Sequence, residues 1–150
     1  MISAFVFALF ATLGFCIIFH VPYRRIPIAA LIGAAGWVVY QLCMSESSSV
    51  MFSCFLGSCA VGLLSEIASR IFKDASTVFT IPGILCLVPG SGTYYTMAEL
   101  VEGNLKAAAS TGSHTLMMSG SIALGLLVVG AVLRIIVAIA HRAKYIANKL

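Results

Sequence analysis

The stretch at residues 80–97 carries the side chains best suited to chemistry, because two Pro-Gly pairs interrupt an apolar run and hydroxyl and phenol groups follow. Proline removes a backbone donor and glycine loosens the backbone, so Pro89-Gly90 should end one half-helix and let another begin at Ser91. The predicted break residues are Pro82, Gly83, Pro89 and Gly90. A helix that starts inside a membrane presents unpaired N–H groups and a positive dipole end, which attract an anion. The predicted substrate-binding residues are Pro89, Gly90, Ser91, Gly92, Thr93 and Tyr94.

The predicted break lies deep in the bilayer. Counting from Thr80 at one interface, Gly90 is roughly 15 Å in, near the midplane of a hydrocarbon layer about 30 Å thick. Broken backbone is tolerated there only where it faces protein or a wet cavity. Thr80 and Pro82 are expected to serve as N-cap and first-turn proline of the opening half-helix. Tyr94 and Tyr95 lie on different faces of the second half-helix, so one can hydrogen-bond a substrate while the other packs. The alternative is that both are aromatic residues at the outer interface.

Two titratable residues are candidates for carrying a coupling proton. Glu66 lies inside an apolar run, where a carboxylate is costly unless it is paired or wetted. It also precedes Arg70 by four residues, which equally predicts an i,i+4 ion pair at the membrane surface. His114 is either a proton relay, because its unperturbed pKa is near physiological pH, or a polar residue at the start of the last span.

Composition places the chain in the membrane. Of its 150 residues, 61% are hydrophobic and only 9% are charged, whereas soluble domains carry about a quarter charged residues. The net charge of +4 comes from basic residues at the ends of apolar runs, which indicates membrane orientation and argues against nucleic acid as a partner. The five cysteines lie inside apolar runs without a close pair, so neither a disulfide framework nor a metal site is expected. Motifs of enzymes and cofactor sites are absent from the sequence, so we expect no enzyme and no cofactor.

The apolar runs predict an all-α, polytopic membrane protein with a single domain over residues 1–150 and about five transmembrane helices, the fourth of them broken. The expected spans are residues 2–19, 28–44, 50–71, 80–97 and 116–138. Residues 98–113 are too polar to span and are expected to form a short helix on the outer surface. Basic residues fall on alternate ends, which predicts an outside N-terminus and a cytoplasmic C-terminus. A re-entrant fourth segment is the alternative.

Two segments resemble the bacterial threonine/serine exporter (ThrE) family, and specifically its small split subunit of the succinate-exporter type. These are GFCIIFHVPYRRIP at residues 14–27 and TVFTIPGILCLVPGSGTYYTM at residues 77–97. The resemblance implies a secondary exporter of threonine, serine or small dicarboxylates in the inner membrane, driven by the proton-motive force. It also implies a larger membrane subunit as the partner.

The leading hypothesis is therefore one subunit of a heteromeric exporter whose substrate site includes Pro89 to Thr93. An odd number of spans independently favours a partner or a homo-oligomer, because two joined five-span modules are inverted relative to each other. An assembly subunit that stabilises a transporting partner without touching substrate is the alternative. A membrane enzyme acting on lipid is the third hypothesis, disfavoured because no acid/base pair lies at one depth.

Overall fold

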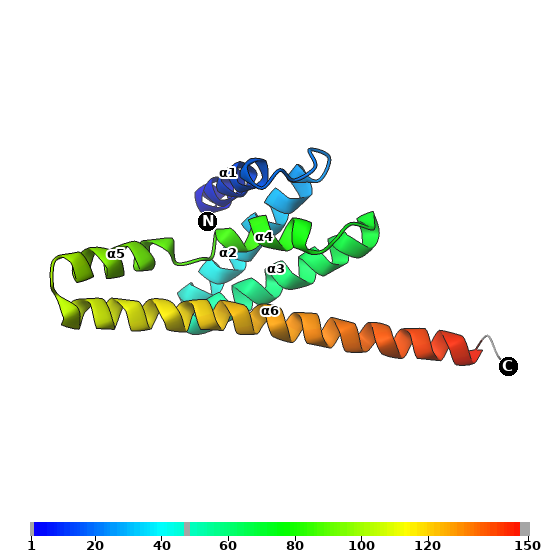
Figure 1. The fold of residues 1–150 in the computed structure, drawn as a ribbon. Helices are drawn as coiled ribbons and strands as arrows, with labels where there is room; N and C mark the ends of the chain where they lie inside the picture. The colour runs from blue at the N-terminus through cyan, green and yellow to red at the C-terminus, as the bar shows by residue number, and fades with distance from the viewer. Residues whose placement is uncertain (1, 47–48, 148–150) are drawn as a thin grey trace.

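The structure is a computed structural model that describes residues 2–46 and 49–147, with the side chains of residues 2, 138 and 140–147 outside the description. The basic residues expected at the C-terminus from His141 onward therefore lie outside the described side chains. Every regular element in the described ranges is a helix (Figure 1). The helices are α1 (Ile2–Ile18), α2 (Ile26–Glu46), α3 (Val50–Phe72), α4 (Thr77–Leu85), α5 (Gly90–Val101) and α6 (Leu105–Ala147).

Most of these helices are apolar enough for a bilayer. In the described ranges α2, α3 and the Leu105–Val137 part of α6 are long enough to cross it alone, and α4 with α5 passes as a pair bent by 54°. With 17 residues, α1 is apolar but shorter, and it is the remaining helix of the five expected. The predicted all-α, multi-pass membrane fold with a broken fourth segment is confirmed.

The break comes at Pro89-Gly90, as predicted. Pro89 is the N-cap of α5, with φ −76° and ψ 66°, outside the helical region. The half-helix before it behaves differently from the prediction, because α4 begins at Thr77 and runs through Pro82 and Gly83 to Leu85. Pro82-Gly83 therefore does not break the helix, and Thr80 is not its N-cap. The Thr80 hydroxyl instead donates to the Ser76 carbonyl at 2.9 Å.

Packing explains why Pro82 is tolerated inside α4. Its ring is fully buried, as is the ring of Phe79 one turn earlier. An added Cβ at Gly83 would be 3.1 Å from Val61 Cγ1 of α3 and in van der Waals contact with the Gly33 nitrogen of α2 at 3.6 Å. The tight contact with α2 and α3 offsets the one backbone hydrogen bond that a proline removes from a helix.

The separate surface helix expected at residues 98–113 does not form. Its residues divide between the end of α5, a turn, and the first turns of α6. Gly103 makes the turn with φ +80°, and the Asn104 side chain accepts a hydrogen bond from the Ala107 amide at 3.3 Å, which caps α6. The prediction was wrong because the polar residues 98–113 were expected to form a helix that ends near residue 113. No proline and no turn interrupts the chain there, so the helix continues.

Close helix crossings hold the rest together. An added Cβ at Gly57 of α3 would be 3.2 Å from the Gly36 carbonyl of α2. The Cys59 thiol of α3 donates to the Gly125 carbonyl of α6 at 3.6 Å. In membranes small residues let helix backbones approach in this way.

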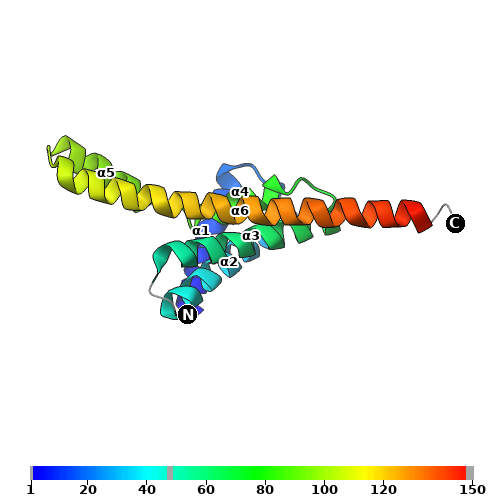
Figure 2. The same ribbon diagram turned by 90° about the horizontal axis from the view of Figure 1, so that it is seen from below.

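By contrast, α5 has no buried residue, and both views show α5 and the first turns of α6 side by side, extending beyond the other helices (Figure 1, Figure 2).

A polar clamp joins two loops at one end of the bundle. Arg25, just before α2, donates from Nε to Asp74 Oδ2 at 2.5 Å and from Nη2 to the Phe72 carbonyl at 3.3 Å. Its guanidinium carbon lies 4.4 Å from the centroid of the Phe72 ring. Phe72 in turn packs against Phe79 of α4, with ring centroids 6.3 Å apart. The clamp thus connects the beginning of α2 with the end of α3 and with α4.

Replacing Arg25 with alanine is expected to lower the free energy of unfolding by about 1 kcal/mol, because a half-buried ion pair and a cation–π contact are lost together. Thermal unfolding in detergent measures the effect. Arg24→Ala is the matched control, since Arg24 is exposed. The charge-swapped double variant R25D/D74R should recover part of the loss, and equal unfolding of the Arg24 and Arg25 variants would contradict the clamp.

Candidate functional site

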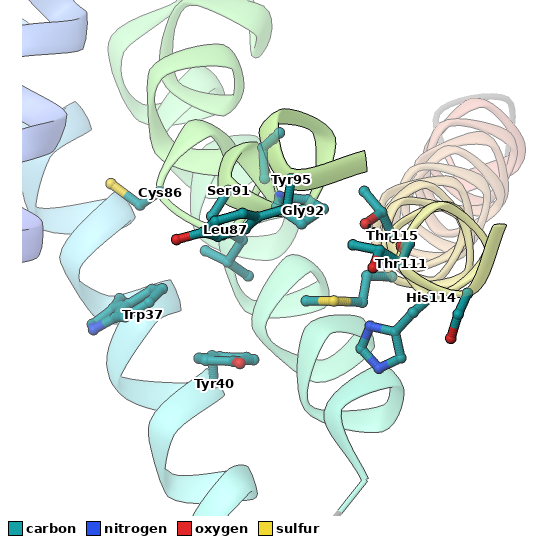
Figure 3. A pocket seen from close by; sticks show the side chains of 14 residues that line it. Trp37, Tyr40, Cys86, Leu87, Ser91, Gly92, Tyr95, Thr111, His114 and Thr115 are labelled. Atoms are coloured by element: carbon teal, nitrogen blue, oxygen red, sulfur yellow. Dashed lines mark hydrogen bonds between the residues drawn. The ribbon is translucent and has the colours of Figure 1, made fainter. Parts of the chain in front are cut away.

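A pocket of about 560 Å³ lies where the broken segment meets α2 and α6 (Figure 3). Residues at the break form the floor of the pocket. Its sides are formed by α2 and by the hairpin of α5 and α6. The lining residues are Trp37, Tyr40, Cys86, Leu87, Val88, Pro89, Ser91, Gly92, Tyr95, Ser110, Thr111, His114, Thr115 and Met118. None of these lining residues is an aspartate, glutamate, lysine or arginine, and His114 contributes an imidazole.

Two unpaired amides lie in the first turn of α5, on residues that line this pocket. The Gly90 amide donates to the Val88 carbonyl at 2.8 Å and the Thr93 amide to the Pro89 carbonyl at 3.3 Å. The amides of Ser91 and Gly92, between them, have no acceptor within the described part of the chain. Two adjacent N–H groups at the positive end of a helix dipole are suited to a carboxylate or another anion.

The wall from α6 is polar. Thr111, His114 and Thr115 recur at three- and four-residue spacing, which places them on one side of the helix. The Thr115 hydroxyl donates to the Thr111 carbonyl at 2.8 Å and is therefore held in place. Facing them from α2 are the rings of Trp37 and Tyr40, whose centroids are 5.2 Å apart. The pocket thus combines hydrogen-bonding groups on one side with an aromatic wall on the other (Figure 3).

The hairpin that forms one side of the pocket is closely packed along a seam of small residues. An added Cβ at Gly92 would collide with the hydroxyl of Thr115, and one at Gly112 would be 3.1 Å from Thr96 Cγ2. Thr96 turns its own hydroxyl back to the Gly92 carbonyl at 2.7 Å, leaving its methyl group toward α6. The positions of the Ser91 and Gly92 amides relative to α6 therefore depend on the absence of a side chain at Gly92.

The structure brings only part of the predicted substrate segment into the pocket. Pro89, Ser91 and Gly92 line it, whereas Gly90, Thr93 and Tyr94 are not among the lining residues. The Thr93 hydroxyl donates to the Gly90 carbonyl at 2.7 Å, and Tyr94 is 70% exposed. Tyr95 lines the pocket and packs edge-on against Tyr94 at 5.6 Å between centroids. The substrate role assigned to all six residues stays a prediction.

The two predicted proton carriers lie in different places. His114 lines the pocket. Glu66 does not, and its Oε2 lies 3.8 Å from Nη2 of Arg70, in the i,i+4 pair that its spacing also predicted. Among the described residues no group of histidine, cysteine, aspartate and glutamate side chains is arranged to hold a metal ion.

Sequence reasoning missed the partners of the broken segment. Trp37 and Tyr40 fell within the expected span at residues 28–44, and Thr111 and Thr115 fell within or just after the expected surface helix at residues 98–113. The recurrence of Thr111, His114 and Thr115 at helical spacing is the signal that indicates one polar face, once α6 is recognised as continuous.

A comparison with protein families matches the chain to the model described as "Threonine/Serine exporter, ThrE", over residues 4–132. No solved structure matches the chain.

Proposed function

Because the chain belongs to the threonine/serine exporter family, a family of transporters and not of enzymes, we propose that it is one subunit of a secondary exporter of small carboxylates or amino acids. Succinate, threonine and serine are the substrate class. We place the substrate carboxylate at the amino end of α5, against the amides of Ser91 and Gly92. The single observation that carries this proposal is that Ser91 and Gly92, whose amides are unpaired, line the same pocket as Thr111 and His114.

The size and lining of the pocket support a small, polar substrate. Its volume of about 560 Å³ lies within the range of about 300–1,000 Å³ for ligand sites. A single carboxylate is recognised by helix-start amides without a full positive charge. Thr111 and His114 are then available for the hydroxyl and amino groups of threonine and serine or for the second carboxylate of succinate, since each carries polar atoms into the same pocket (Figure 3).

The exposed surface of the hairpin supports a partner subunit. No residue of α5 is buried, and exposed apolar side chains such as Met97 and Val101 extend along it. The pocket is also open on one side, which a second membrane subunit of the same family would cover. We propose a larger membrane subunit as that partner, with a homo-oligomer as the alternative arrangement.

The distribution of basic residues supports one orientation in the inner membrane. Gly125 of α6 contacts Ser58 of α3, and Val129, one turn later, contacts Gly62, which is also one turn later. The two helices therefore run in the same direction. Lys73 and Arg134 then lie toward the same end of the bundle, and the clamp brings Arg25 to that end as well. Positively charged loops stay in the cytoplasm, so we propose a cytoplasmic C-terminus and an outside N-terminus.

Transport of labelled succinate, threonine and serine by vesicles containing the native complex tests the proposal. Thr111→Val and His114→Leu, each of which removes a polar contact at similar volume, are expected to lower efflux roughly ten- to a hundredfold, the equivalent of one hydrogen bond to a charged group. Ser113→Ala is the matched control on α6, because Ser113 is exposed and outside the pocket. If an intact complex transports normally with both pocket variants, the chain is an assembly subunit and the substrate site is elsewhere.

A further inference from the structure

We propose that a groove between α1, α2 and α4 binds one acyl chain of a membrane lipid, against two residues that also line the pocket of Figure 3. The groove measures about 500 Å³, and nine residues from these three helices line it. The inference goes beyond the proposed function and does not depend on it, because it requires only that the chain lies in a bilayer.

The groove exists because α1 presents small side chains to α2. At Gly33 the two helices are in close contact, since an added Cβ there would collide with the Thr12 hydroxyl. Toward the beginning of α1 the contact loosens. The alanines of α1 that line the groove are Ala4, Ala8 and Ala11, which three- and four-residue spacing places on one side of the helix. Their methyl groups leave the space beside the Trp37 ring unfilled.

The groove lies at the depth of the lipid chains. With 21 residues, α2 is about 30 Å long, which equals the thickness of the hydrocarbon layer. Trp37 is near the middle of α2, and Gln41 is about one turn farther along, still within the helix. On α1 the groove extends from Ala4 to Phe15, about 16 Å by helical rise. At this depth the surrounding medium is acyl chain and contains neither headgroups nor bulk water.

The lining suits a hydrocarbon chain. None of the nine lining residues is charged, and Gln41 is the one with a side-chain amide. The volume lies within the range of about 300–1,000 Å³ for ligand sites, so the groove has room for one chain and not for a whole lipid. Phe7 lines the groove and is 75% exposed, so the groove opens sideways. A chain can therefore enter from the bilayer without crossing water.

The position of α1 argues for a lipid and against the partner subunit as the occupant. Within the described ranges α1 contacts α2 and α4 and no other helix. Figure 1 shows α1 on the opposite side of the bundle from α6. The partner subunit was placed on the hairpin of α5 and α6, so it leaves the groove facing the bilayer.

The lipid chain would contact the wall of the pocket from outside. Trp37 and Cys86 line both cavities. Figure 3 shows these two residues at the side of the pocket away from α6. A chain in the groove therefore packs against Trp37 and supports the aromatic wall, so we infer that the lipid is a structural component of this wall.

Fluorescence of Trp37 tests the proposal, because Trp37 is the one tryptophan in the sequence. The native complex is reconstituted into phosphatidylcholine vesicles with or without bromine on the acyl chains, since bromine quenches tryptophan emission at close range. Emission that is missing from Trp37→Phe belongs to Trp37, whatever tryptophans a partner contains. Brominated chains are expected to remove most of the Trp37 emission. Bromine in the terminal half of the chain should act most strongly, because Trp37 lies near the middle of α2.

Two variants of α1 form the matched pair. Ala11→Phe places a ring in the groove and should restore most of the Trp37 emission in brominated vesicles. Val6→Phe adds the same ring on an exposed position outside the groove and should be quenched like the wild type. Equal quenching of the two variants, or an unquenched wild type, overturns the site. The bromine series on the wild type needs no variant, and strongest quenching by bromine next to the headgroup also overturns it.

Discussion

Alanine at Gly92 is expected to reduce transport by roughly ten- to a hundredfold, although it adds only one methyl group. That methyl group would collide with the Thr115 hydroxyl across the seam, so α5 must move away from α6. Overpacking of this kind costs about 1–3 kcal/mol, and displacing a binding group by about 1 Å can lower a rate by two orders of magnitude. The measurement is the initial rate of substrate efflux from vesicles, normalised to the amount of inserted complex.

The chain offers its own control two residues away. Gly90 precedes the same helix turn, yet an added Cβ there has nothing within 4 Å, so Gly90→Ala should transport like the wild type. The double variant G92A/T115A removes the colliding hydroxyl and methyl groups and should transport faster than Gly92→Ala alone. Equal loss in the Gly90 and Gly92 variants, or no rescue by the double variant, would contradict a role for the seam.

Valine at Gly125 is expected to have the largest effect on the folded protein, because it separates α3 from α6. An added Cβ at this position would collide with the Ser58 hydroxyl and lie 2.8 Å from the Phe55 carbonyl. Backbone atoms cannot give way as a flexible side chain does, so we expect a loss of about 3 kcal/mol or more of folding free energy. Thermal unfolding and size-exclusion chromatography in detergent measure the loss.

Gly130 provides the comparison on the same helix. It has open space where a Cβ would be, and its replacement by valine changes helix propensity by the same amount. Gly130→Val should therefore unfold close to the wild-type temperature. If Gly125→Val and Gly130→Val are equally stable, the close approach of α3 and α6 is not what holds this part of the fold together.

The sequence was most informative where a residue type restricts the backbone directly. Pro89 without an N–H and Gly90 without a Cβ predicted the break of the fourth segment, because this restriction is local. The same rule failed at Pro82, because burial against α2 and α3 stabilises a helix through that residue. The local rule predicts a helix break where solvent or a cavity faces the Pro-Gly pair. Where other helices pack against the pair, that tertiary packing keeps the helix intact.

The candidate site was predicted only in part for a related reason. Ser91 and Gly92 follow from the break, whereas Trp37, Tyr40 and Thr111 enter the pocket through the packing of α2 and α6. That packing depends on α6 continuing through the polar residues 105–113, which composition alone assigned to the surface. A polar helix face that lines a pocket and one that meets water have the same pattern in the sequence, so only the arrangement of the helices distinguishes them.

The most direct test of the whole account is the distance between a bound substrate carboxylate and the first amides of α5. Solid-state NMR of the membrane-embedded complex, with ¹⁵N in the protein backbone and ¹³C in the substrate carboxyl, measures it. The account expects Ser91 and Gly92 nitrogens within roughly 4 Å of the carboxyl carbon, as hydrogen bonds to its oxygens require. Saturated, transport-competent complex in which the carboxyl carbon is near other residues and far from both amides would contradict it.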